Sequence, residues 1–371
     1  MFILRNLKHT KHMKKSILVL LILVCVLPFV SGFYSENYTY TTTVEHLFTH
    51  CLIAYPDIAF KKNNPMRENY NIDCITSFEF KKMLDSMYKN NYILVNINDT
   101  FKNENGKTIK TSIKIPKGKK ALVLSFDDVN YDHKKMGLGM VDKIILDKNN
   151  NFATQTNING KIDISYDKEF VCILENFVKL HPDFSLNNAK GTINLTGYDG
   201  VLGYRTQSKN ITNRQSEIKE AKKVIKKLKE CGWNFASHSY GHYHMNKLTD
   251  KQFEEELKLW KDEVEPLVGK TKVYVYPYGE WSVYDADSLT VKHKLLLKYG
   301  FELFCGVGMK TFYSYLPTKS NQKVLFMDRK CVDGTTLRKD DINLHPFFNP
   351  KSVYDYLFRP SSFIYSTETI K

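Results

Sequence analysis

The chain has 371 residues, a formal net charge of +14 and a hydrophobic content of 42%. This composition excludes a disordered chain, and the length suits one large domain with a substantial core. The lysines are spread along the chain, and no arginine stripe with interleaved aromatics occurs. We therefore expect no nucleic-acid partner and interpret the positive charge as a lysine-rich solvated surface.

The first 32 residues have the pattern of an export signal. Five basic residues precede an uninterrupted apolar run at 17–30, and small residues suited to cleavage follow at 31–32. The run is shorter than the roughly 20 residues that a spanning helix needs, so we expect cleavage, with an uncleaved membrane anchor as the alternative. Cleavage would lower the net charge to +9. We predict a secreted protein or one associated with the cell surface or envelope.

Six cysteines lie beyond the predicted signal, at Cys51, Cys74, Cys172, Cys231, Cys305 and Cys331. They are too scattered for a Cys-x-x-Cys metal site, and a chain of this size does not need a disulfide framework. Three of them lie in apolar periodic segments and are predicted to be buried thiols: Cys172, Cys231 and Cys305. Export permits a bridge, and Cys51 with Cys74 is the first candidate.

Strands and helices alternate along the chain. Short apolar runs predict strands at 51–55, 92–97, 122–126, 233–236, 273–276 and 301–307. Apolar residues at helical spacing predict helices that open at the capping boxes of Thr76, Thr212 and Thr249, and further helices at 170–180 and 291–299. This alternation indicates a parallel α/β fold, either barrel-like or layered.

Three other regions differ from this alternation. Residues 33–44 are polar and rich in tyrosine, and we interpret them as a loose leader. Residues 129–210 contain many Asn, Asp and Gly, which indicates an insertion with short strands within a domain that spans 45–345. The tail at 346–371 is expected to form one more aromatic-rich helix on the surface.

The strand predicted at 122–126 ends in two adjacent carboxylates, Asp127 and Asp128. Charged side chains are costly to bury unless they are paired or bind a metal, and the carboxyl ends of parallel strands are where α/β proteins place their sites. Taken alone, the pair is equally consistent with a solvated turn in which Asp127 caps the next element.

Two histidines follow the strand predicted at 233–236. His238 and His242 are four residues apart and lie on one face if the turn is helical, close enough to share one ion. A carboxylate and two imidazoles form a facial set with open positions. The second carboxylate of the Asp127–Asp128 pair would then be free to accept a proton from water, which predicts a metal-assisted hydrolase.

Three segments together resemble the motifs of the polysaccharide deacetylases, the NodB-homology carbohydrate esterases. They are Ser125–Asp128, His238–His242 and Tyr276–Glu280, the last in the form seen in poly-N-acetylglucosamine deacetylases. The resemblance covers residues 45–345. It implies a distorted (β/α) barrel that binds one divalent metal ion, with zinc expected and cobalt, nickel or iron as alternatives.

Carried over to the matching positions, the resemblance assigns Asp127 as the general base. It assigns the metal ligands as Asp128, His238 and His242. Water activated by the metal would attack the acetamide group of an N-acetylhexosamine polymer.

The third motif and the residues after it would supply the substrate groove. The resemblance implies that the backbone N–H of Tyr278 holds the oxyanion. Tyr278, Trp281 and Tyr284 are candidates to pack on sugar rings, and ordinary core packing is an equal alternative.

The sequence departs from the family pattern in two places near the motifs. Val129 stands where a glycine usually follows the paired aspartates. Val275 stands where the family has an arginine that orients the catalytic aspartate, and Arg205 and Arg329 are the candidates to replace it.

The family's last motif carries a histidine that protonates the leaving amine. His345 is the nearest candidate, although Pro346 and a polar context follow it, and His133 is the reserve.

The leading hypothesis is an exported, metal-dependent N-deacetylase that acts on a cell-wall or surface polysaccharide, including peptidoglycan. Two alternatives remain open. One is a non-catalytic glycan-binding protein that kept the metal site, and the other is an O-acetyl esterase that uses the same chemistry.

Overall fold

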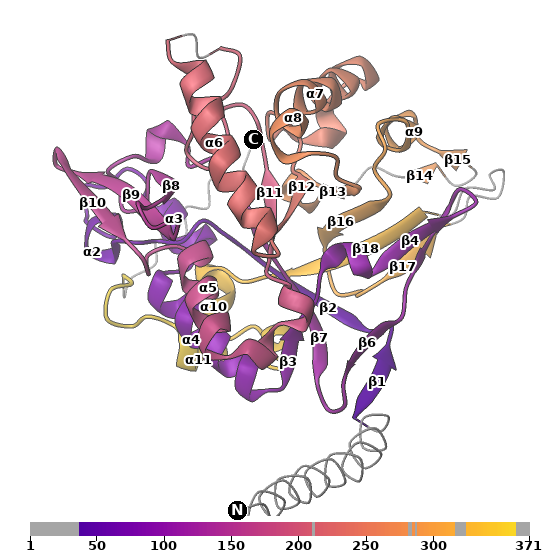
Figure 1. Ribbon diagram of the computed structural model, residues 1–371, viewed down its shortest axis with the longest axis horizontal. Coiled ribbons are helices and arrows are strands. Elements are labelled where there is room, and N and C mark those ends of the chain that lie inside the picture. The colour runs from indigo at the N-terminus through magenta and orange to yellow at the C-terminus, as the bar shows by residue number, and fades with distance from the viewer. Residues whose placement is uncertain (1–36, 210–211, 281–283, 286–287, 316–323, 361–371) are drawn as a thin grey trace, which may run out of the picture.

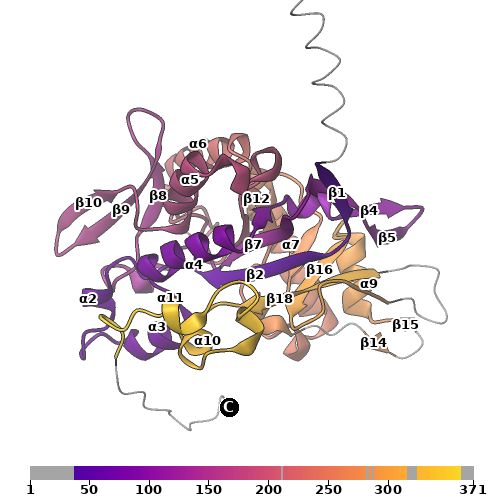
Figure 2. The same cartoon turned by 90° about the horizontal axis from the view of Figure 1, so that it is seen from below.

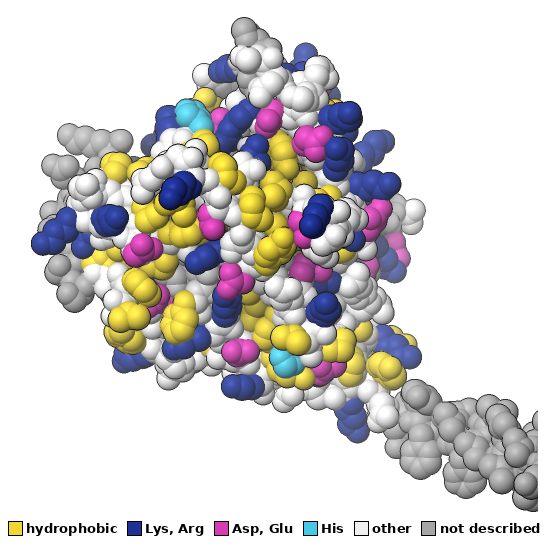
Figure 3. All heavy atoms as spheres, turned by 60° about the vertical axis from the view of Figure 1, so that its left-hand side comes forward, with side chains coloured by type: hydrophobic (Ala, Val, Ile, Leu, Met, Phe, Trp, Pro, Cys, Tyr) yellow, Lys and Arg dark blue, Asp and Glu magenta, His cyan; other side chains and the backbone are white. Residues whose placement is uncertain are grey.

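The computed structural model describes residues 37–209, 212–280, 284–285, 288–315 and 324–360 (Figure 1). The predicted signal at 1–32 and residues 33–36 of the predicted leader lie outside these residues. The rest of the leader is not loose, because it contains the strand β1 (Tyr38–Thr41) and the first residue of the next strand, Val44. Within the described part of the chain, no helix is long and apolar enough to cross a membrane. On the face shown in Figure 3, basic side chains are scattered among acidic and hydrophobic ones.

Seven parallel strands form a closed barrel, which confirms the predicted fold class. In barrel order they are β7 (Lys120–Asp127), β11 (Thr192–Leu195), β12 (Asn234–Ser237), β13 (Val273–Val275), β16 (Leu303–Val307), β18 (Val324–Cys331) and β2 (Val44–His50). The ring closes because β7 pairs with β11 on one side and with the whole of β2 on the other. β3 (Tyr92–Leu94) also pairs with β7, and β17 (Tyr313–Tyr315) pairs antiparallel with β18.

Helices and small sheets surround the barrel (Figures 1 and 2). The helices are α2 (Pro56–Ala59), α3 (Arg67–Asp73), α4 (Ser77–Lys89), α5 (Phe170–Leu180), α6 (Arg214–Glu230), α7 (Asp250–Glu263), α8 (Glu265–Val268), α9 (Val291–Lys298), α10 (Gly334–Arg338) and α11 (Pro350–Val353). The small sheets pair β1 (Tyr38–Thr41) with β6 (Ile113–Pro116), β4 (Phe101–Glu104) with β5 (Lys107–Lys110), and β14 (Tyr284–Asp285) with β15 (Ser288–Leu289). A fourth small sheet, of β8 (Lys143–Leu146), β9 (Phe152–Ile158) and β10 (Lys161–Ser165), projects from one side.

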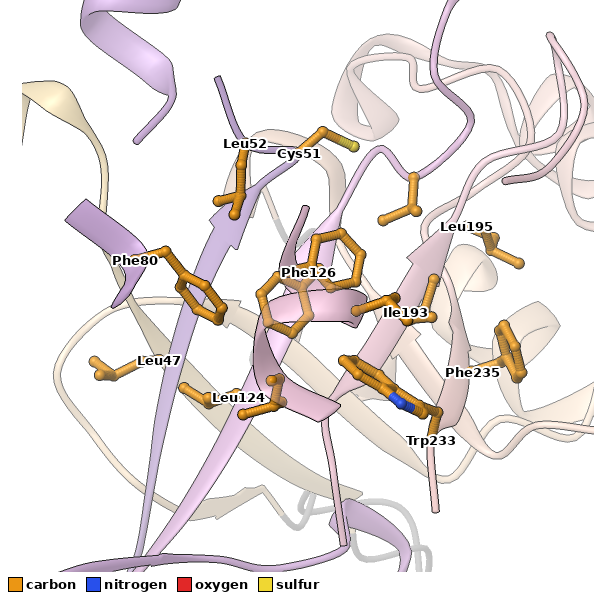
Figure 4. Close-up of a cluster of buried hydrophobic side chains, with 14 of the residues drawn as sticks. Leu47, Cys51, Leu52, Phe80, Leu124, Phe126, Ile193, Leu195, Trp233 and Phe235 are labelled. Carbon is orange, nitrogen blue, oxygen red and sulfur yellow. The ribbon is translucent and has the colours of Figure 1, made fainter. Parts of the chain in front are cut away.

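The alternation of side chains along β7 separates two apolar clusters. Ala121 and Val123 belong to a cluster made mainly of barrel-strand residues, whereas Leu122, Leu124 and Phe126 pack in a larger cluster with the surrounding helices. Figure 4 shows Phe126 in this second cluster, and its ring stacks on Phe170 with centroids 3.9 Å apart. Because successive strand residues point to opposite faces, Ser125 and Asp127 share the face of Ala121 and Val123.

The predicted helices form, with one difference at a helix start. α4 and α7 begin at the capping boxes of Thr76 and Thr249, as predicted. The capping box predicted at Thr212 does not form, because α6 begins at Arg214 with Asn213 as its N-cap and without a side-chain cap. The tail after residue 349 forms only the short helix α11 in the described residues.

Two predictions about strands need correction. The first barrel strand is Val44–His50, so the strand predicted at 51–55 was wrong. Residues 51–54 are buried in the large cluster, and this burial of a loop explains their apolar composition. Region 129–210, which we expected to be an insertion, also contains α5 and the barrel strand β11.

The six described cysteines are all free thiols, so the candidate bridge between Cys51 and Cys74 does not form in this structure. Cys172 and Cys305 are buried, as predicted, whereas Cys231 is half-buried.

Candidate metal centre and active site

The predicted metal ligands come together at the carboxyl ends of two barrel strands. Asp128 follows β7, and His238 follows β12. The Oδ1 atom of Asp128 lies 3.6 Å from Nε2 of His242 and 4.0 Å from Nε2 of His238. The three ligand atoms therefore form a compact group that can hold a metal ion.

The chemistry of this group fits a divalent cation. Nδ1 of His238 lies 3.0 Å from the carbonyl oxygen of Val275. Because a carbonyl only accepts, Nδ1 carries the proton and the lone pair of Nε2 faces Asp128. Oδ1 of Asp128 is buried and has no hydrogen-bond partner among the described residues. Buried polar atoms usually have a partner, so this oxygen is available to coordinate a cation.

The protonation of the third ligand also suits a metal. Burial lowers the pKa of His242 to about 4, although the Asp128 carboxylate opposes this effect. The imidazole is therefore neutral at pH 7, which is the form that binds a metal ion.

Arg329 holds the candidate base, Asp127. Two guanidinium nitrogens donate to the two carboxylate oxygens at 2.7 and 3.0 Å, and the side chains are 1% and 3% exposed. Asn194 of β11 donates a further hydrogen bond of 2.6 Å to Oδ1. Burial alone would raise the pKa of Asp127, but the charge and hydrogen bonds of Arg329 foremost outweigh burial and hold the pKa well below its usual range. Of the two arginines that the sequence offered in place of Val275, Arg329 contacts Asp127.

Arg205 has a different task, on the loop that follows β7. Its guanidinium donates to the carbonyl oxygens of Asn130 and Tyr131, at 3.2 and 2.6 Å. It also lies 3.2 Å from the Asp199 carboxylate, which in turn accepts hydrogen bonds from the backbone and ring of His133. Arg205 and Asp199 therefore fasten the segment that carries Asp128. Asp132, His133 and Asp199 are also close enough to one another to share an ion. Because the Arg205 guanidinium balances Asp199, we interpret this group as a support and not as another metal site.

Non-glycine residues in the left-handed backbone region mark the site. Asp128, Ser239, His242 and Tyr278 have φ angles between 55° and 59°. Side chains in this conformation are strained by about 1–3 kcal/mol each and persist where the surroundings hold them. Their concentration here agrees with a functional site.

Tyr278 lies at the pocket beside the ligands and is 55% exposed. Its ring is 4.6 Å from that of His242 and stacks on His244 at 4.0 Å. His244 is held by a hydrogen bond of 2.8 Å to Glu280. Tyr278 is therefore available to a substrate. Trp281 lies outside the described residues, and so does the side chain of Tyr284.

The structure does not bring the predicted proton donors to the pocket. His345 pairs with Asp340 at 3.0 Å, and His133 pairs with Asp199. Neither is among the described residues that line the pocket. His345 lies beyond α10, at the end of η7 (Ile342–Leu344), and not at the end of a barrel strand.

His50, which we did not predict as a site residue, lines the pocket instead. It is the last residue of β2, and its Cα is paired with that of Asp127. Nδ1 of His50 donates to the carbonyl oxygen of Asp73 at 2.9 Å, which leaves Nε2 to exchange a proton. We did not predict His50 as a site residue because the strand predicted at 51–55 would begin after His50, whereas the observed strand ends at His50.

The pocket encloses about 410 Å³, within the usual range for small-molecule sites. Its walls include the four predicted residues at the strand ends together with Arg329, His50 and Tyr278. Further walls come from α3 and from η2 (His133–Lys135). The site is therefore a candidate metal centre with an adjacent clamped carboxylate, in the mouth of a parallel barrel.

Comparison with known families agrees with the motifs. Residues 206–300 match the family described as polysaccharide deacetylase, and this segment contains the second and third motifs. The match covers about a quarter of the chain, and over that segment it agrees with the predicted resemblance. No curated protein shows a significant sequence match to the chain.

Several solved structures are similar to the chain at low sequence identity. The deacetylase PplD from Streptococcus pyogenes is 14% identical, with 80% of this chain and 97% of that chain covered and a TM-score of 0.42. IcaB from Ammonifex degensii is 12% identical, with 79% and 93% covered and a TM-score of 0.43. A de-N-acetylase from Aggregatibacter actinomycetemcomitans is 13% identical, with 80% and 97% covered and a TM-score of 0.41. The fold assignment rests on the strand order and not on these similarities.

Proposed function

We propose that the protein is an exported, metal-dependent hydrolase that removes N-acetyl groups from an N-acetylhexosamine polymer of the cell wall or surface. The observation that carries this proposal is the ionised, clamped Asp127 beside the group of Asp128, His238 and His242. The family match of residues 206–300 supports the reaction class. Export rests on the signal pattern at 1–32.

The residues divide the reaction between them. A divalent metal held by Asp128, His238 and His242 would polarise the acetamide carbonyl and lower the pKa of water at the site. Asp127 accepts the proton of the water whose oxygen attacks the carbonyl carbon. The backbone N–H of Tyr278 is our candidate donor to the oxyanion of the tetrahedral intermediate.

Breakdown of the intermediate needs a proton on the leaving nitrogen, and we assign this step to His50. Its Nδ1 is fixed by Asp73, so the protonated ring presents Nε2–H to the pocket. Transfer of this proton accompanies cleavage of the C–N bond and releases acetate and a free amine. The Asp127 carboxylic acid then returns its proton to solvent or to His50.

Acetate release tests the proposal. Purified residues 33–371, loaded with zinc, should release acetate from a chitooligosaccharide, poly-N-acetylglucosamine or a peptidoglycan fragment. A chelator and the Asp127→Asn substitution should each abolish the release. A folded, metal-loaded protein that is inert on all three polymers would rule out this function.

The two alternatives are separated by the same assay. Glycan binding without turnover, unchanged in Asp127→Asn, would indicate a non-catalytic binding protein. The contact between Arg329 and Asp127 counts against this alternative, because Arg329 takes the place of the arginine that is missing at Val275. Faster release from O-acetylated than from N-acetylated oligomers would indicate an esterase.

A further inference from the structure

The carboxyl end of α3 is held by side chains from distant parts of the chain. A helix leaves its last four carbonyl groups without partners inside the helix, so other groups must satisfy them. The carbonyl oxygen of Ile72 accepts from the hydroxyl of Thr335 at 3.3 Å, and that of Asp73 accepts from Nδ1 of His50 at 2.9 Å. Asp73 and Cys74 also line the pocket, so this helix end is part of the pocket wall.

Arg359 supplies further contacts at the same helix end. Its guanidinium donates to the carbonyl oxygens of Asn71 and Cys74, at 3.2 and 2.7 Å. It also donates to both carboxylate oxygens of Glu79, each at 2.7 Å, and both side chains of this ion pair are fully buried. Arg359 therefore fixes the backbone on both sides of Asp73.

Packing fixes the guanidinium as well. Arg359 belongs to the segment that follows α11, and α10 packs against both α3 and α11 (Figure 2). A Cβ at Gly334, the first residue of α10, would lie 2.4 Å from Nη1 of Arg359 and 2.2 Å from the carbonyl oxygen of Asn71. The close approach of α10 therefore leaves the guanidinium no space for a second position.

We propose that Arg359 is a positioning residue for His50, because it fixes the end of α3 whose Asp73 carbonyl orients the His50 ring. This inference rests on the proposed function, in which His50 protonates the leaving amine. The Asp73 carbonyl accepts from Nδ1 in the protonated ring, and it still does so in the neutral ring after Nε2 has given up its proton. A neutral imidazole in water favours the proton on Nε2, so the Nδ1–H tautomer depends on this fixed acceptor.

The kinetic test combines Arg359→Met with Glu79→Gln, so that neither partner stays buried as an unpaired charge. On the zinc-loaded protein, the double substitution should lower kcat for acetate release by about 10- to 100-fold and change KM by less than about twofold. In a His50→Gln background it should lower kcat by less than about twofold further, because the residue that it positions is already lost. Arg67→Met is the matched control, since this arginine donates to the carbonyl oxygen of Phe60 at the other end of α3, and it should leave kcat unchanged.

A second measurement does not depend on activity. Long-range ¹H–¹⁵N spectra of histidine-labelled protein, at a pH where the ring is neutral, report the tautomer of His50, whose signal is identified by its loss in His50→Gln. The wild-type ring should carry the proton on Nδ1, and the variant with Arg359→Met and Glu79→Gln should shift toward Nε2–H. Gly334→Ala displaces the guanidinium without removing it and should cause a shift in the same direction, which keeps the test available if the double variant does not fold.

An unchanged tautomer and kcat in the folded variants would overturn the assignment of Arg359. An equal loss of kcat in the His50→Gln background would also overturn it, since Arg359 would then act through another group. If the wild-type protein releases no acetate but the His50 tautomer responds to the substitutions, the proposed function fails and the positioning of His50 by Arg359 stands. Zinc content and thermal unfolding of each variant exclude a general loss of structure.

Discussion

Arg329 offers the sharpest test of the site. It donates hydrogen bonds of 2.7 and 3.0 Å to both oxygens of Asp127, and both side chains are almost completely buried. At this separation and an effective dielectric constant of about 20, the gross attraction is about 6 kcal/mol, much of which desolvation offsets. Arg329→Met leaves Asp127 as an unpaired buried charge, which should lower the free energy of unfolding by about 3–5 kcal/mol.

The same substitution should change the pH dependence of the reaction. Without Arg329, the effect of burial is opposed much less and the pKa of Asp127 rises, so the acidic limb of the kcat/KM profile should move to higher pH. Loss of orientation should also lower kcat by about 10²- to 10⁴-fold. Because the folded-state pKa of Asp127 is depressed, the pair stabilises the fold fully above about pH 4 and loses this effect as the pH falls further.

Two assays check these expectations: acetate release as a function of pH, and urea unfolding of the metal-loaded protein. Arg329→Lys keeps the charge but not the paired hydrogen bonds, so it should be intermediate. Adding Asp127→Asn to Arg329→Met removes the unpaired charge and should recover stability. An Arg329→Met protein with an unshifted acidic limb and a stability within about 0.5 kcal/mol of wild type would refute the role of the clamp.

Three further predictions concern other parts of the site and the core. His50→Gln should lower kcat by about 10²- to 10⁴-fold with little change in KM, because the donor to the leaving amine is lost; a kcat above half of wild type would exclude this role. Arg205→Met should weaken zinc binding by about 10- to 100-fold, measured by calorimetry, because the loop that carries Asp128 loses its support; unchanged affinity would contradict this. Gly191→Ala should cost about 1–3 kcal/mol in urea unfolding, since its Cβ would lie 2.6 Å from Phe126; an unchanged midpoint would show that the core adapts.

The parts of the site that are local in sequence were predictable. Asp127 and Asp128 are adjacent, and His238 and His242 are four residues apart, so each pair can be recognised from its separation in the sequence. Arg329 was only one of two candidates, because its contact with Asp127 depends on strands more than 200 residues apart. That contact follows from barrel closure, which no local pattern encodes.

The fold was predictable wherever apolar periodicity reflects burial in a regular element. Helix 170–180 and the capping boxes at Thr76 and Thr249 were confirmed for this reason. The strand predicted at 51–55 was wrong because this segment is a buried loop, and hydrophobicity alone does not distinguish a buried loop from a buried strand. β11 was missed within 129–210, because it is only four residues long and lies among polar turns.

The pairing of the first barrel strand, β2, with the last, β18, has a consequence for the timing of activity. His50 lies at the end of β2, whereas Arg329 lies in β18, near the other end of the chain. A chain that is still being synthesised contains the candidate metal ligands long before it contains Arg329, which holds the candidate base. Because such non-local pairing forms late, catalytic competence should appear only after the complete barrel has closed. If the proposed function holds, we expect no acetate release before residues 324–331 have joined the barrel.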